Sequence, residues 1–338
     1  MPRPGVRLLR ASVRIASPVL RLLVITRALT LLAYDDVNLR LKYDWAVSLP
    51  ASFVPGNYLS AVCPNGDLYT ASKDGRIISI DREGHISARS GRLEFALRTI
   101  ACSPVGNLYI AGETPDHTDH LLVFGPAPDY RLLFSSRLNI SVLSMAVGQD
   151  RIFVAGFLQN STFPLHVMSL HGNIQRSFGE SGGARADPVL ADGYLLWDTE
   201  NLRLLFAPRK LPEVQVYDAE GTQLQVKGLG PNQPASVQWR KSAPETTGIG
   251  LLRAGAILIE SATESAQGRH LLLNLLDGKL QPIAKVNIEE PQLLAGGDQK
   301  YGIYFVTSHR IVHAQVLNRL DEKRPLLKRA SRLAYIGR

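Results

Sequence analysis

The sequence predicts an all-β protein in which small antiparallel sheets repeat and pack on one another. The main observation is a recurring pattern: a short apolar strand, a turn of Gly, Asn or Asp, and a second strand. One such hairpin cannot bury its own apolar face, so the copies must shelter one another. The composition, with 45% apolar residues, 28 glycines and 20 prolines, fits many short strands joined by turns. The clearest copies of the pattern occupy 59–71, 100–111, 145–155 and 189–197.

Six repeat units can be placed between residues 40 and 317. They average about 46 residues, close to the length of four-stranded propeller blades. The Asp74-Gly75 step in the first unit is a strong hairpin signal. We therefore predict a six-bladed β-propeller with four-stranded antiparallel blades. The second and third strands of the six units are expected at 67–71 and 76–80, 107–111 and 121–124, 151–157 and 165–170, 194–197 and 214–217, 256–260 and 270–275, and 302–307 and 310–316.

Two further segments complete the predicted ring. An open ring of blades would leave long unpaired strand edges. Leu39–Leu49 alternates apolar and polar residues and is expected to close the ring as a strand beside the sixth unit. The spacing between units lengthens near residues 228–248, which are rich in Pro, Gln and Ser, and we interpret them as an elongated loop.

The first two units resemble NHL-type repeats of six-bladed β-propellers. The resemblance is fair in units three and four, positional in five and six, and spans about four-fifths of the chain. It implies architecture rather than activity, because such propellers include ligand-binding, partner-binding and enzymatic members. The segments that carry it are Ala61-Val62-Cys63-Pro64-Asn65-Gly66-Asp67-Leu68-Tyr69, Gly75-Arg76-Ile77-Ile78-Ser79-Ile80-Asp81-Arg82-Glu83-Gly84 and Ser103-Pro104-Val105-Gly106-Asn107-Leu108-Tyr109-Ile110-Ala111.

Positive charge is concentrated at the two ends of the chain. Residues 1–33 hold six arginines and no acid, and 318–338 carry a net charge of +5. Of the total of +8, this leaves −3 for residues 34–317, the predicted propeller. Nucleic-acid binding needs a dense basic face, so we expect none. We interpret 318–338 as a basic C-terminal tail.

The basic N-terminal segment 1–33 is not part of the repeat. Its apolar stretch at 22–33 is typical of an export signal or a membrane-proximal anchor, although Arg27 interrupts it. A cationic amphipathic helix on anionic lipid and an unstructured extension are the alternatives. Membrane contact is expected only through this segment, and an extracytoplasmic or membrane-associated location is favoured over a cytoplasmic one.

The chain has two cysteines, Cys63 and Cys102, in consecutive units. We interpret both as small buried residues. A disulfide would require their Cα atoms to lie within about 7 Å, which adjacent inner strands satisfy only near the axis.

Loops that join the second and third strands of each blade should emerge on one face of the ring. They are expected at 72–75, 113–120, 159–163, 198–201, 262–268 and 307–309. Their side chains are the candidate contacts for a ligand or partner: Lys73, Asp116, His117, His120, Asn160, Asp198, Glu200 and His309.

Two sets of these residues raise the question of a metal. His117 and His120, with nearby carboxylates, could ligate Zn²⁺, but a third or fourth ligand from another loop is not visible. Lactonase-type propellers hold Ca²⁺ with acidic and amide side chains, and the comparable set here is Asp198, Glu200, Asn201 and Asn160. Turn formation accounts for these residue types as well, so we predict neither a metal nor another cofactor.

The predicted function is a non-catalytic binding or scaffold module that presents a loop-rich face to a protein or a small ligand. No Gly-x-Ser-x-Gly elbow is present, and no other complete catalytic set is visible in the sequence. The alternative is a metal-dependent hydrolase or lyase of the lactonase kind, using Ca²⁺ or Zn²⁺.

Overall fold

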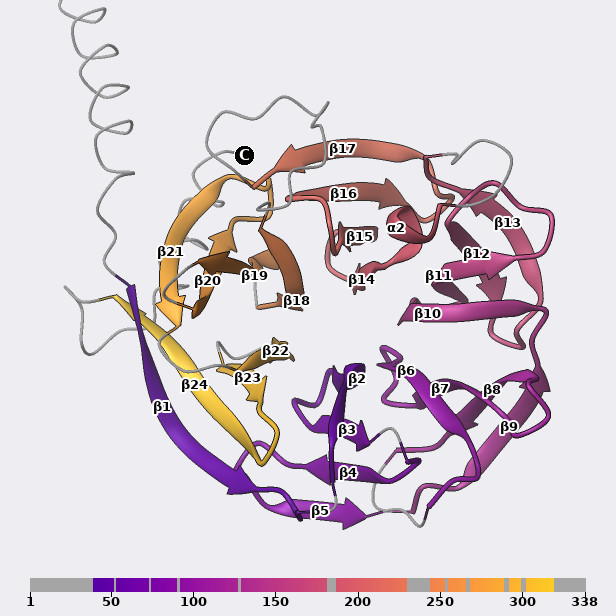
Figure 1. The fold of residues 1–338 in the computed structure, drawn as a ribbon, viewed down its shortest axis with the longest axis horizontal. Helices are drawn as coiled ribbons and strands as arrows, with labels where there is room; N and C mark the ends of the chain where they lie inside the picture. The colour runs from indigo at the N-terminus through magenta and orange to yellow at the C-terminus, as the bar shows by residue number, and fades with distance from the viewer. Residues whose placement is uncertain are drawn as a thin grey trace, which may run out of the picture. The chain divides into compact units, whose positions relative to one another are not determined.

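The computed structural model describes residues 39–318 except 52, 73, 90–91, 127–128, 181–186, 230–243, 253–254, 266–267, 289–291 and 299–301. Within them, six four-stranded antiparallel sheets stand around a common axis as the blades of a β-propeller (Figure 1). The predicted fold class is therefore confirmed. The segments 1–33 and 319–338 lie outside the described residues, so their proposed roles stay predictions.

Five blades are built from strands that follow one another in the sequence, numbered from the axis outward. Blade one contains β2 (Pro55–Val62), β3 (Leu68–Ser72), β4 (Ile77–Ile80) and β5 (Ile86–Arg89). Blade two contains β6 (Ala96–Cys102), β7 (Leu108–Glu113), β8 (Asp119–Phe124) and β9 (Leu132–Arg137). Blade three contains β10 (Ile140–Val147), β11 (Arg151–Leu158), β12 (Leu165–Ser169) and β13 (Ile174–Phe178). Blade four contains β14 (Gly193–Asp198), β15 (Arg203–Pro208), β16 (Glu213–Asp218) and β17 (Gln223–Gly228). Blade five contains β18 (Glu245–Leu251), β19 (Ile257–Ser265), β20 (Gly268–Leu276) and β21 (Pro282–Ile288).

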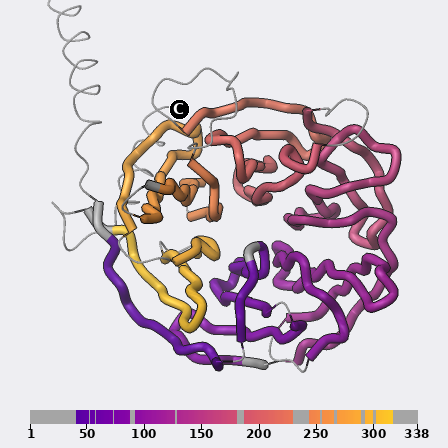
Figure 2. The backbone as a smooth tube through the Cα atoms, in the orientation of Figure 1, coloured from indigo at the N-terminus to yellow at the C-terminus, as the bar shows by residue number. Residues whose placement is uncertain are grey.

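The sixth blade joins the two ends of the propeller. It consists of β22 (Leu293–Gly297), β23 (Gly302–Val306), β24 (Arg310–Asn318) and, on the outside, β1 (Leu39–Ser48). The predicted closing strand is confirmed, since β1 pairs antiparallel with β24 (Figure 2). Trp45 stacks on His313 of β24 with ring centroids 5.2 Å apart, and its indole N–H donates to the carbonyl of Arg82 in blade one at 3.0 Å. The N-terminal strand thus ties blade six to blade one.

Blade four differs from the prediction by one strand. The segment expected to be its second strand, 194–197, lies in the innermost strand β14, and the true second strand β15 had not been predicted. The reason is local: Asp187 caps a short helix, α2 (Pro188–Ala191), by accepting a hydrogen bond from the N–H of Val189 at 2.9 Å. Pro at the first helical position and Asp at the cap are both typical of a helix start. The segment 189–197, where the hairpin pattern recurs, is therefore most of a short helix, one connecting residue and one strand.

The predicted elongated loop at 228–248 is shorter than expected. Residues 230–243 lie outside the described residues, but β18 already begins at Glu245 and includes the last four residues of that segment.

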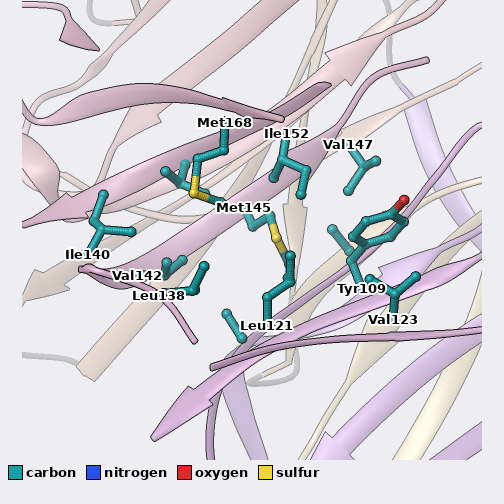
Figure 3. Packing of buried hydrophobic residues seen from close by; sticks show 13 residues of the cluster. Tyr109, Leu121, Val123, Leu138, Ile140, Val142, Met145, Val147, Ile152 and Met168 are labelled. Atoms are coloured by element: carbon teal, nitrogen blue, oxygen red, sulfur yellow. The ribbon is translucent and has the colours of Figure 1, made fainter. Parts of the chain in front are cut away.

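Neighbouring blades bury their apolar faces against each other. Between blades two and three, Met145 and Met168 lie among aliphatic side chains and the ring of Tyr109 (Figure 3). All of the labelled residues in this cluster are buried. Packing of this kind around the ring is what allows blades that are too exposed to stand alone to form a stable unit. Other members of the cluster are Leu121, Val123, Leu138, Ile140, Val142, Val147 and Ile152.

A disulfide joins blades one and two. Cys63 and Cys102 follow or end the innermost strands β2 and β6, and their Cα atoms are 5.2 Å apart. The interpretation of Cys63 and Cys102 as two separate small buried residues is therefore wrong, because they are bonded to each other. Adjacent innermost strands converge toward the axis, which brings the two residues within bonding distance.

Candidate functional site

A cavity of about 580 Å³ runs along the propeller axis, and we call it the channel. All six innermost strands contribute to its wall, which is mainly apolar. Volume and lining are those of small-molecule sites in proteins, which are mostly apolar with a few well-placed polar groups. One wall residue from each blade in turn is Val62, Ala101, Met145, Leu196, Ile249 and Leu294.

The channel has two chemically different ends. At the end where the innermost strands begin, which we call the mouth, it is lined by Tyr58, Tyr194, Arg269 and Gln292. The opposite end, where these strands finish, is lined by the disulfide, prolines, Trp197 and Glu200. Loops between second and third strands emerge on the side of the mouth, because successive strands of a blade are antiparallel.

Tyr58 reaches across the mouth. Its φ of 51° places it in the left-handed region, within the irregular register of β2 between Pro55 and Ser60. This conformation is uncommon for a bulky residue and persists only where surrounding contacts hold it. The ring lies 4.6 Å from that of Tyr194 in blade four, and the hydroxyl donates to the carboxylate of Asp192. The side chain of Tyr58 therefore narrows the entrance to the channel.

Three polar atoms of channel-lining residues lack a hydrogen-bond partner in the described part of the chain. They are the hydroxyl oxygen of Ser144, the indole nitrogen Nε1 of Trp197 and the side-chain carbonyl oxygen Oε1 of Gln292. The amide nitrogen of Gln292 is engaged, donating to the hydroxyl of Tyr43 at 3.2 Å. A buried polar group left unpaired costs about 1–3 kcal/mol, so such groups call for an explanation. A bound ligand would supply their partners.

A buried carboxyl lies directly behind the channel wall. Glu260 on β19 is fully buried, and its Oε2 accepts from the hydroxyl of Thr247 at 2.6 Å and from the N–H of Leu294 at 3.0 Å. Its other oxygen has no partner among the described residues. Burial raises the pKa of Glu260 to about 7, against the lowering effect of these hydrogen bonds. Thr247 and Leu294 line the channel, so this carboxyl is one side chain away from any ligand.

The strand geometry explains how Glu260 connects two blades. Thr247 is the extra residue at a register shift of β18, and Gly248 follows it. A Cβ on Gly248 would lie 2.6 Å from the carbonyl oxygen of Leu294, so glycine permits β22 to approach β18. Bulges of this kind re-aim side chains near functional sites.

Charged side chains of both signs lie at the mouth. Arg209 lies 3.5 Å from Glu245 and 3.7 Å from Asp192, and Lys210 pairs with the same Glu245. Arg269 lines the channel, and the structure records no ion pair for it within the described residues. Among the described residues Arg269 therefore makes no recorded ion pair, although Glu264 lies opposite it on β19 and its charge acts on the buried Glu260.

The predicted residues of the 113–120 loop form a self-contained hydrogen-bond network. Asp116 accepts from the hydroxyls of Thr114 and Thr118, and His117 lies 2.5 Å from Glu113, which pairs in turn with Arg98. His120 is on β8 rather than in the loop, and its ring packs near Phe95. The described residues contain no group of three or more His, Cys, Asp or Glu that could hold a metal ion.

Two other predicted residues lie on the same side as the mouth. Asn160 adopts a φ of 67° in the turn after β11, and His309 lies 3.2 Å from the hydroxyl of Ser308, which lines the channel. Lys73 lies outside the described residues. The binding roles of Asp116, His117, His120, Asn160 and His309 stay predictions.

The expected placement of Asp198 and Glu200 is wrong. The loop 198–201 joins the first and second strands of blade four, so it emerges on the side opposite the mouth. Asp198 is buried and accepts from Arg203 Nε at 2.9 Å and from Asn201 Nδ2 at 2.7 Å, which organises the turn. Glu200 is exposed and lines the far end of the channel.

Sequence reasoning missed the residues of the mouth. One signal was present for Glu260, since a glutamate inside the apolar run 256–262 has no place in an ordinary buried strand. Tyr58, Ser144, Gln292 and Arg269 carry no comparable signal in the sequence, because they come together only when the ring closes.

Comparisons with known proteins support the architecture. No protein-family model and no curated protein sequence matches the chain. A DUF4221-family protein of Bacteroides vulgatus has a similar structure, with a TM-score of 0.55 and 11% identity over 83% of this chain and 99% of that one. A Bacteroides fragilis protein predicted to be exported is similar as well, with a TM-score of 0.58 and 9% identity over 84% of this chain and 97% of that one. At such identities the likeness shows the fold alone, that of a β-propeller.

In the part of the chain that the structure describes, none of the helices has the length and apolar character needed to cross a bilayer.

Proposed function

We propose that this propeller is a non-catalytic binding protein whose small ligand enters the channel through the mouth. The observation that carries the proposal is the set of three unpartnered polar atoms, Ser144 Oγ, Trp197 Nε1 and Gln292 Oε1, in a mainly apolar wall. A ligand that bonds to these atoms recovers their desolvation cost. The volume of about 580 Å³ is within the range of about 300–1,000 Å³ typical of such sites.

The metal-dependent hydrolase or lyase stays an untested alternative. The 113–120 loop gives it no support, because Glu113, Asp116 and His117 already bond to side chains within the protein. Metal binding there would require those contacts to be replaced.

We place the protein outside the cytoplasm. The support is the disulfide between Cys63 and Cys102, since disulfides persist mainly in oxidising compartments, together with the basic and apolar segment 1–33. Protein isolated under thiol-trapping conditions from its native cell should contain no free thiol. Two trapped thiols in that protein would contradict this location.

Saturable binding of a neutral apolar dye, Nile red, tests the function. We expect one site per chain by fluorescence titration. The double substitution Ala61→Leu and Ala295→Leu adds bulk to the channel wall and should weaken binding by about tenfold or more. Ala51→Leu, at an exposed turn, is the matched control and should leave binding unchanged. Circular dichroism checks that each variant folds. Equal binding by folded wild-type, channel and control proteins would overturn the proposal.

A further inference from the structure

We propose that the ligand is an amphiphilic carboxylate, with its apolar body in the channel and its carboxylate on Arg269 at the mouth. This inference rests on the proposed function and names the chemical class of the ligand.

The wall of the channel favours a ligand with an apolar body. Every blade contributes aliphatic side chains, and the far end adds Trp197, Leu251 and Leu252. An alkyl or aryl body is favoured there, because its transfer from water gains about 25 cal/mol per Å² of apolar surface buried. Unpartnered polar atoms in the described wall are few, namely those of Ser144, Trp197 and Gln292.

The charges at the mouth favour a ligand with an anionic head group. Asp192 already accepts from Tyr58 and lies 3.7 Å from Arg209, and Glu245 is engaged by Lys210. A cationic ligand would find these carboxylates occupied. Arg269 has no recorded ion pair in the described chain, and its planar guanidinium matches a carboxylate with two parallel hydrogen bonds. The mouth therefore selects an anionic head group.

Glu260 makes the binding of an anion depend on pH. The groups that face it are the hydroxyl of Thr247, the N–H of Leu294, the cation of Arg269 and the ring hydroxyl of Tyr194, from four different strands. A ligand carboxylate on Arg269 would repel the ionised form of Glu260 and weaken its attraction to Arg269. Binding should therefore strengthen as the pH falls through about 7, where Glu260 takes up a proton.

Competition against Nile red by three compounds with the same chain tests the ligand class: decanoate, decanol and decylamine. We expect decanoate to displace the dye at about tenfold lower concentration than either of the others, and at lower concentration at about pH 6 than at about pH 8. Arg269→Gln should remove the advantage of decanoate and leave decanol unchanged. Arg176→Gln, at an exposed position of β13, is the matched control and should change neither.

Glu260→Gln separates the two parts of the inference. This variant should still prefer decanoate to decanol, but the concentration of decanoate that displaces the dye should be the same at the two pH values. Equal displacement by decanoate and decanol, or a decanoate preference that survives Arg269→Gln, would overturn the ligand class while channel binding stands. Nile red binding that is unchanged in the double variant Ala61→Leu, Ala295→Leu would instead overturn the proposed function.

Discussion

The loop Glu113–His120 and the mouth of the channel differ in a way that residue types do not reveal. The loop is rich in His, Asp and Glu, yet its polar groups bond to one another and to Arg98. The mouth is formed by residues with little local signal, yet it holds Arg269 without a recorded ion pair in the described chain, and the channel that it opens into has unpartnered atoms on Ser144, Trp197 and Gln292. A ligand can therefore form new hydrogen bonds and ion pairs at the mouth and in the channel without replacing existing ones, whereas in the loop it would have to replace them.

The comparison shows that a binding site is better identified by unmet hydrogen-bonding capacity than by reactive residue types. Polar groups that already have partners must lose them before they can bind a ligand, whereas unpartnered ones gain outright. The following predictions test whether the two regions differ in this way.

The largest effect should come from Glu260 behind the mouth. Its pKa rises from 4.5 to about 7 on folding, so the folded state holds a proton that the unfolded chain releases between these values. The free energy of unfolding should therefore fall by about 3 kcal/mol as the pH rises from about 4.5 to about 7. Subtracting the pH profile of Glu260→Gln from that of the wild type isolates this contribution. Parallel profiles in urea unfolding would show that Glu260 is not held neutral.

A smaller effect should come from breaking the loop network. Arg98 pairs with Glu113 and lies 3.0 Å from Asp119, and it also donates to Ser141. Arg98→Met should lower the free energy of unfolding by about 1–2 kcal/mol, because Asp119 loses the cation beside it and Glu113 keeps only His117 as a side-chain partner. Nile red binding should be unchanged. Arg176→Met, at an exposed site, serves as the control for loss of charge. Weaker dye binding without loss of stability would assign the loop to the site.

The smallest effect is expected at Ser144. Ser144→Ala removes a buried hydroxyl that has no partner among the described residues, so stability should stay within about 0.5 kcal/mol or rise slightly. Ser79→Ala provides the contrast, since the hydroxyl of Ser79 is buried and lies 2.9 Å from that of Ser87. Its loss should cost about 1 kcal/mol in thermal or urea unfolding. Equal losses for the two serines would show that Ser144 has a partner.

The sequence predicted the six blades and the closing strand because both depend on local patterns. Turn residues such as Asp74-Gly75 and the alternation in Leu39–Leu49 act over a few positions. The prediction for blade four was displaced by one strand, because Asp187 and Pro188 start a helix where the hairpin pattern predicts a strand. As a result, Asp198 and Glu200 were predicted on the side of the ring opposite to the one where they lie.

The mouth could not be predicted for a different reason. Tyr58 and Asp192 are 134 positions apart and belong to blades one and four, so only closure of the whole ring brings them together. The disulfide was missed on similar grounds, since Cys63 and Cys102 are 39 positions apart and their distance depends on how adjacent innermost strands converge. Contacts across the axis are set by the ring and not by any one repeat.

A crystal structure of the protein with decanoate tests the central claim most directly. We predict that the alkyl chain lies in the channel and the carboxylate lies at Arg269, within hydrogen-bond distance of its guanidinium. Decanoate bound at the loop Glu113–His120 or on an outer strand, with the channel filled only by water, would contradict the account.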